Sequence, residues 1–132
     1  MIQDKARVKK ALDNIYLAHS QFESFCKEPF HTDRERAGII QSFEFTLEAF
    51  WRYFQAYSIE QGLSSNSPKQ SLQNALQLNL IDPQDEIVWI DMIDDRNKTS
   101  HIYHKALAEE ILDRILKSYQ GMFKKTIVRL KS

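Results

Sequence analysis

One short stretch of the chain, residues 94–104, gathers the side-chain types that acid–base and phosphate chemistry use. It reads Asp-Asp-Arg-Asn-Lys-Thr-Ser-His-Ile-Tyr-His. The guanidinium of Arg96 keeps its charge at neutral pH, and its planar fork fits two phosphate oxygens. The imidazole of His101 is suited to moving a proton near neutral pH. Together these residues indicate a site that binds a phosphate and transfers a proton.

Arg96 and His101 can converge only if the helix is interrupted between them. In an unbroken α-helix, residues with this spacing lie about 140° apart around the axis. Asn97, Thr99 and Ser100 are weak helix formers with good capping chemistry, which favours a turn there and a new helix starting at His101. The positive end of that helix dipole would favour the neutral imidazole that a general base needs.

The same residues also have an ordinary structural interpretation. Arg96 can pair with Asp91 or Asp95 in a surface ion pair. His101 can begin a helix in solvent, and Tyr103 can pack on a neighbouring helix with its hydroxyl exposed. The residue types alone leave this interpretation open.

Other chemistries find little support in the composition. The chain has 3 glycines far apart, which excludes a glycine-rich phosphate loop. Its histidines and carboxylates show no metal-ligand spacing, so we expect neither a metal nor a cofactor. Cys26 is the single cysteine and is expected to be a small half-buried hydrophobe.

The chain length and charge balance indicate one domain spanning residues 1–132. The sequence has 132 residues, 18 acidic and 18 basic side chains, and 42% hydrophobic residues. With no signal-like or membrane-spanning apolar run, we expect a cytoplasmic protein without membrane contact. Neutral net charge removes the simplest argument for nucleic-acid binding, but it does not exclude a local basic patch near the C-terminus.

Apolar residues recur every three or four positions, which predicts an all-α fold. The elements that must position residues 94–104 are five expected helices, over about 2–26, from 32 or 33 to 61, 67–80, 82–93, and from 99 or 100 to 130. Ser67-Pro68 and Asp82-Pro83 are cap-then-proline starts, and Gly62 is an expected helix end. Short connections predict an antiparallel, up-and-down bundle of four to five helices. The second helix carries so many aromatics that it must be central or buried against another subunit.

Three segments in combination resemble a known family. Residues 36–51 read R-A-G-I-I-Q-S-F-E-F-T-L-E-A-F-W, residues 67–82 run from Ser-Pro to Leu-Ile-Asp, and residues 89–103 run from W-I-D-M to R-N-K-T-S-H-I-Y. Together they resemble the HEPN superfamily, in particular the small helical proteins encoded beside minimal nucleotidyltransferases. Those proteins are known as nucleotidyltransferase substrate-binding proteins and HepT-type toxins. The family usually has lysine where this chain has Arg52, and often glycine where it has Asn79.

The resemblance implies a HEPN-like homodimer, joined through the long aromatic helix and the motif region. Arg96 and His101 of both protomers would line one cleft. The implied activity is metal-independent RNA cleavage in a toxin–antitoxin pair, with Asn97 orienting the two catalytic side chains. The RNA would be a tRNA or an mRNA.

The resemblance also implies a partner, a cognate minimal nucleotidyltransferase that acts as the antitoxin. Tyr103 would be the hydroxyl that this partner modifies with a nucleotide. Lys98 and His104, beside the motif, are candidate substrate-binding residues. The alternative is a non-catalytic subunit that binds the substrate of the transferase.

Overall fold

The regular elements of the computed structural model, which describes residues 2–99 and 104–131, are all helical. They are α1 (Ile2–Lys27), α2 (Asp33–Glu60), α3 (Pro68–Gln77), the 3-10 turn η1 (Pro83–Asp85), α4 (Glu86–Thr99), α5 (Lys105–Arg114), the π-helical turn η2 (Ile115–Tyr119) and α6 (Gln120–Lys131).

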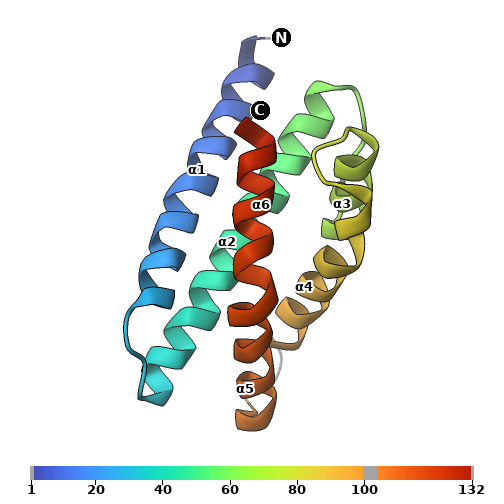
Figure 1. Ribbon diagram of the computed structural model, residues 1–132. Helices are drawn as coiled ribbons and strands as arrows, with labels where there is room; N and C mark the ends of the chain where they lie inside the picture. Colours follow the sequence, from blue (N-terminus) through green and yellow to red (C-terminus); the bar gives the residue numbers. More distant parts are fainter. Residues whose placement is uncertain (1, 100–103, 132) are drawn as a thin grey trace.

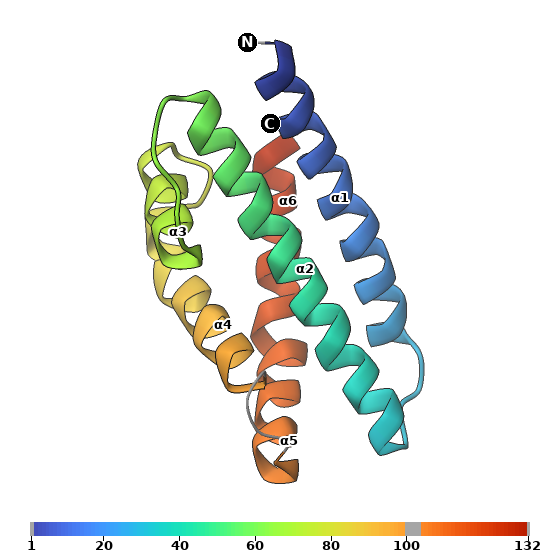
Figure 2. The same cartoon turned by 180° about the vertical axis from the view of Figure 1, so that it is seen from behind.

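The helices form one bundle in which α2 is the central element. Figure 1 shows α1 and α2 side by side as an antiparallel pair, with α3 and α4 on the other side of the bundle. Helices α5 and α6 join through η2 into one continuous rod, and the view from behind shows α2 crossing the whole molecule (Figure 2). The all-α, up-and-down bundle predicted from the periodicity is confirmed.

Local capping chemistry fixes both ends of α2 and the start of α3 where the sequence indicated, while α3 ends at Gln77, earlier than the expected residue 80. The Thr32 hydroxyl accepts the Glu35 N–H at 3.1 Å, and the Glu35 carboxylate accepts the Thr32 N–H at 3.1 Å, which completes a capping box. Gly62, with φ of 84°, follows the end of α2. Ser67 caps α3, and Pro68 is its first residue.

The predicted start of the last helix at Thr99 or Ser100 is wrong, and so is the part of the expected turn that falls on Asn97 and Thr99. Ser100 and His101, on which the rest of that prediction falls, lie outside the described residues. Asn97 and Thr99 belong to the last turn of α4, and α5 begins at Lys105. Thr99 uses its hydroxyl inside that last turn, donating to the Arg96 carbonyl at 2.8 Å, instead of capping a new helix. The N-cap of α5 is His104. The helix that follows α4 therefore starts later than predicted.

The aromatic side chains of α2 are used inside the bundle. Phe43 and Phe50 of α2 stack on Phe123 of α6 with centroid separations of 6.0 and 5.2 Å. Trp89 of α4 meets Phe50 edge-on at 5.3 Å. Such ring pairs add about 0.5–1.5 kcal/mol each beyond the burial of their area. The central position of α2 therefore accounts for most of its aromatic side chains within one chain, although Phe45 is 54% exposed.

Cys26 lies half-buried near the end of α1, as the sequence predicted. Burial raises the pKa of its thiol to about 11. The thiolate is the reactive form, so this cysteine is nearly inert at neutral pH.

Among the residues described, no helix combines the length and the apolar character that a bilayer crossing requires.

Asn79 follows α3 in a left-handed backbone conformation. Its φ is 63°, and the following Leu80 N–H donates to the Ala75 carbonyl at 2.9 Å. Asparagine and glycine tolerate this region, while other residues strain against the backbone. The same left-handed conformation explains why the family that this sequence resembles often has glycine at this position.

Replacing Asn79 tests this backbone requirement. Asn79→Ala is expected to lower the free energy of unfolding by about 1 kcal/mol, because alanine lacks the short polar side chain that lets asparagine adopt the left-handed region, whereas Asn79→Gly changes it by about 0.5 kcal/mol or less. Urea unfolding followed by circular dichroism measures both. Gln77→Ala, on the exposed last residue of α3, is the matched control. Equal stability of the alanine and glycine variants would contradict the interpretation.

Candidate functional site

The candidate residues of the motif lie at the end of α4 and the start of α5. Arg96, Asn97 and Lys98 occupy the last turn of α4, and His104 caps α5. His101 and Tyr103 lie outside the residues that the structure describes. The structure therefore describes Arg96, the residue predicted to bind phosphate, together with its neighbours on α4.

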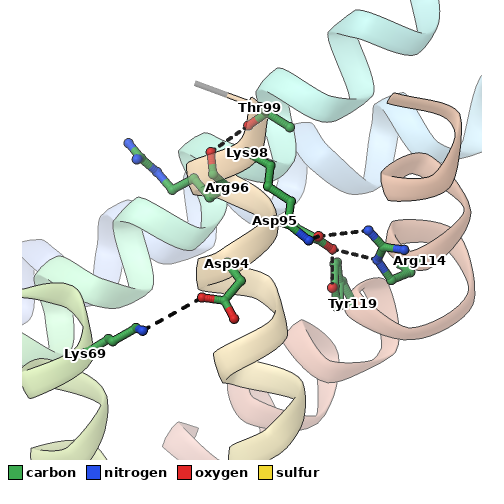
Figure 3. A network of polar contacts seen from close by, with 8 residues as sticks. All are labelled: Lys69, Asp94, Asp95, Arg96, Lys98, Thr99, Arg114 and Tyr119. Atoms are coloured by element: carbon green, nitrogen blue, oxygen red, sulfur yellow. Dashed lines mark hydrogen bonds and ion pairs between the residues drawn. The ribbon is translucent and has the colours of Figure 1, made fainter. Parts of the chain in front are cut away.

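A buried carboxylate joins the end of α4 to the α5–α6 rod. Asp95 is 4% exposed and accepts two hydrogen bonds from Arg114, from Nε at 2.7 Å and from Nη2 at 2.8 Å. The Tyr119 hydroxyl donates to the same carboxylate at 2.5 Å (Figure 3). Lys98 Nζ adds a longer contact at 3.9 Å. Arg96 is thus not the partner of Asp95 that the ordinary structural interpretation allowed.

The π-helical turn makes the double contact with Asp95 possible. In a regular α-helix, residues spaced like Arg114 and Tyr119 would point about 140° apart. The wider turn η2, over Ile115–Tyr119, lies between them and lets both face one carboxylate. Burial and the bond to Asp95 raise the pKa of Tyr119, so the phenol stays protonated and can donate.

Asp95 also sets the direction of its neighbour Arg96. Successive residues of an α-helix are about 100° apart around the axis, so fixing Asp95 toward Arg114 turns Arg96 toward a different side of α4. Figure 3 shows the Arg96 and Lys98 side chains leaving the helix in different directions. Arg96 lies toward α2, where its Nη2 is 4.0 Å from the Glu48 carboxylate.

Two glutamates of α2, Glu44 and Glu48, lie near Arg96 on the side of α4 that faces α2. Glu48 also accepts a hydrogen bond from Arg52 Nη2 at 2.8 Å, so it links two guanidinium groups. Burial raises the pKa of Glu44, while the Arg96 charge and the nearby Thr99 hydroxyl oppose that rise. Reasoning from the sequence missed both glutamates, although their spacing of four places them on one helix face.

Two cavities adjoin the motif. One, of about 270 Å³, lies between α2, α3 and α4, and its lining includes Trp51, Arg96 and Asn97. The other, of about 180 Å³, lies between α2 and α5, and its lining includes Glu44, Thr99 and His104. The structure therefore brings Arg96 and Asn97 together and places His104 at a separate cavity.

Lys98 and His104, both predicted to bind substrate, have structural contacts. Lys98 faces Asp95, and His104 Nδ1 accepts the Leu107 N–H at 3.4 Å. Basic residues of the C-terminal helices are likewise paired: Lys117 with Asp113, Lys124 with Glu23, and Lys125 with Asp85.

Among residues 2–99 and 104–131, no three histidine, cysteine or carboxylate side chains gather as a metal-binding group.

The chain is similar to known proteins along most of its length. Residues 10–132 match the model of a family described as nucleotidyltransferase substrate binding protein like. A crystal structure of a protein from Thermus thermophilus matches with a TM-score of 0.78 and 32% identity, covering 89% of this chain and 99% of that one. Among curated proteins, none matches the sequence.

A second solved structure shares the fold. It is a chain from a mutant of the toxin–antitoxin pair MntA-HpeT, with a TM-score of 0.66 and 19% identity. The match covers 98% of this chain and 95% of that chain.

Removing the Asp95 carboxylate is expected to destabilise the protein strongly. Asp95→Ala leaves the Tyr119 hydroxyl without its acceptor and Arg114 without its partner. We expect the free energy of unfolding to fall by about 2–4 kcal/mol. This loss is smaller than that for a fully buried ion pair, because Arg114 is 39% exposed. The adjacent Asp94→Ala is the matched control, since Asp94 is 48% exposed and reaches Lys69 at 3.9 Å. Urea unfolding of the two variants compares them, and equal midpoints would refute the role of Asp95.

The raised pKa of Glu44 predicts a pH-dependent effect on stability. The folded state holds the Glu44 proton more tightly than the unfolded state, so this group's contribution falls as pH rises through its folded pKa. Glu44→Gln should therefore be more stable than the parent at pH 7, with the difference vanishing at low pH. Thermal melts across pH measure this, with the exposed Glu110→Gln as control. A destabilised variant at pH 7 would show that the ionised carboxylate is favourable.

Proposed function

Because the chain belongs to the nucleotidyltransferase substrate-binding protein-like family, as its motifs indicated, we propose that it is the toxin of a toxin–antitoxin pair. In this proposal it is a HEPN-type, metal-independent endoribonuclease. A cognate minimal nucleotidyltransferase is its antitoxin, and both act in the cytoplasm. The likeness to a chain of a toxin–antitoxin pair supports the fold that this function requires.

The observation that carries the proposal is the placement of Arg96 and Asn97. The Asp95 contacts fix the last turn of α4, and Arg96 and Asn97 then line one cavity. Arg96 is 37% exposed, which leaves its guanidinium accessible to a phosphate while its neighbours hold it in place. Preorganised charge of this kind stabilises the charge that develops in a transition state.

The proposed reaction is an internal attack within the RNA. His101 removes the proton of a ribose 2′-hydroxyl, and the 2′-oxygen attacks the adjacent phosphorus. The bond from phosphorus to the 5′-oxygen breaks, and that oxygen takes a proton from an imidazolium. The products are a 2′,3′-cyclic phosphate and a 5′-hydroxyl. Arg96 stabilises the phosphorane charge, Asn97 orients the pair, and Lys98 and His104 assist RNA binding.

We further propose that two copies of the chain form the complete site. In the homodimer, Arg96 and His101 of each protomer would line one cleft, so that one imidazole serves as base and the other as acid. The start of α5 lies at one end of the bundle, where a second copy can approach it (Figure 1).

A second candidate function is favoured by the description of the family itself. As a nucleotidyltransferase substrate-binding protein, the chain would present a substrate, or its own Tyr103, to the transferase without cutting RNA. Tyr103 would then gain the mass of a nucleotide when the partner and a nucleoside triphosphate are present.

RNA cleavage in EDTA separates the two functions. The purified protein is expected to cut a tRNA or mRNA and leave a 2′,3′-cyclic phosphate, and His101→Ala should slow cleavage by about 100-fold or more. The exposed His31→Ala is the matched control. Mass spectrometry of the new ends identifies the product. If the parent cuts no RNA, or if His101→Ala cuts as fast, the ribonuclease proposal fails.

A further inference from the structure

The cavity beside Arg96 has walls suited to a flat aromatic ligand. It measures about 270 Å³ and is lined mainly by apolar side chains of α2, α3 and α4, including Phe54 and Leu72. Both tryptophans of the chain, Trp51 and Trp89, contribute to its lining. Pockets for drug-sized ligands measure about 300–1,000 Å³, so this slightly smaller cavity suits a single ring system.

The indole N–H groups of these two tryptophans have no acceptor among the described residues. Trp51 Nε1 and Trp89 Nε1 are buried, and neither has a hydrogen-bond partner in the part of the chain described. Trp89 as a whole is 1% exposed. A buried donor without an acceptor is costly, and buried tryptophan N–H groups usually find one. Because both N–H groups are buried, the indoles must turn toward the cavity before a ligand with ring nitrogens or carbonyl oxygens can accept from them. A purely aliphatic ligand offers no acceptor.

Polar side chains at the same cavity define the rest of the ligand. Asn97 is exposed and offers an amide donor and acceptor. Glu48 offers acceptors, and its carboxylate lies 4.0 Å from the Arg96 guanidinium. Arg96 suits a phosphate. The combination of a flat ring with acceptors and an attached phosphate describes a nucleotide.

We propose that this cavity is a nucleobase-binding subsite, in which one base occupies the space lined by Trp51 and Trp89 while its phosphate lies against Arg96. The inference rests on the proposed function, because it identifies what the RNA presents beside the scissile phosphate. Base–aromatic contacts of this kind contribute to single-stranded RNA binding with little dependence on sequence.

The two indole resonances provide a direct test, because the chain has only 2 tryptophans. In ¹H–¹⁵N spectra of the full chain, each of the four ribonucleoside 5′-monophosphates is titrated, with ribose 5-phosphate as the ligand that lacks a base. At least one nucleotide should shift both indole signals saturably, and ribose 5-phosphate should shift neither. If no nucleotide shifts them, or if ribose 5-phosphate shifts them equally, the subsite is refuted.

A single-residue variant tests the role of the N–H group. Trp51→Phe keeps an aromatic ring but removes the donor, and it should weaken nucleotide binding about five-fold or more. Tyr57→Phe, on the same helix but outside the cavity lining, is the matched control. The dispersed Trp89 signal reports that the variant is folded. Unchanged affinity in folded Trp51→Phe would overturn the assignment.

RNA cleavage measured on the same samples distinguishes the subsite from the ribonuclease proposal. Base-dependent shifts without cleavage would support the subsite and refute the ribonuclease. Cleavage without base-dependent shifts would refute the subsite and leave the ribonuclease in place. An RNA oligonucleotide that shifts the indole signals where mononucleotides do not would also overturn a subsite that recognises a single nucleotide.

Discussion

The position of the candidate site depends on the Asp95 carboxylate. This group is almost fully buried, and it is tolerated there because Arg114 and Tyr119 both donate hydrogen bonds to it. These bonds tie the last turn of α4 to the α5–α6 rod. Because side-chain directions on a helix are set by its rotation, the same bonds aim Arg96 at α2 and the neighbouring cavity. The buried Asp95 carboxylate thus determines the side of α4 from which the Arg96 guanidinium projects.

Local rules were sufficient for most helix ends, and they failed where a residue had two possible partners. Ser67-Pro68 favours a helix start and Gly62 a helix end, so the sequence located the start of α3 and the end of α2. Thr99 can cap a following helix or bond backward to a carbonyl, and it does the latter. The prediction considered only the capping preference of Thr99, and it therefore placed the start of the last helix too early.

The site was predicted in part, for a related reason. Arg96 was predicted because a guanidinium suits a phosphate, and Asn97 because the family resemblance implied that it orients the catalytic pair. Asp95, Glu48 and Trp51 were missed as members of the site because their roles come from contacts across helices. The π-helical turn that pairs Arg114 with Tyr119 has no simple sequence signal, since it changes the very periodicity from which helices are recognised. Most of the aromatic side chains of α2, by contrast, reflect its central position in the bundle, and Phe45 is the exposed exception among its phenylalanines.

The half-buried thiol of Cys26 has a practical consequence for studying assembly. With its pKa raised to about 11, it reacts slowly with maleimides or spin labels near neutral pH. A second cysteine introduced on an exposed helix face would therefore take up a label selectively without first replacing the native one. Paired labels of this kind report distances between copies of the chain, so the wild-type background already suits spectroscopic mapping of subunit arrangement.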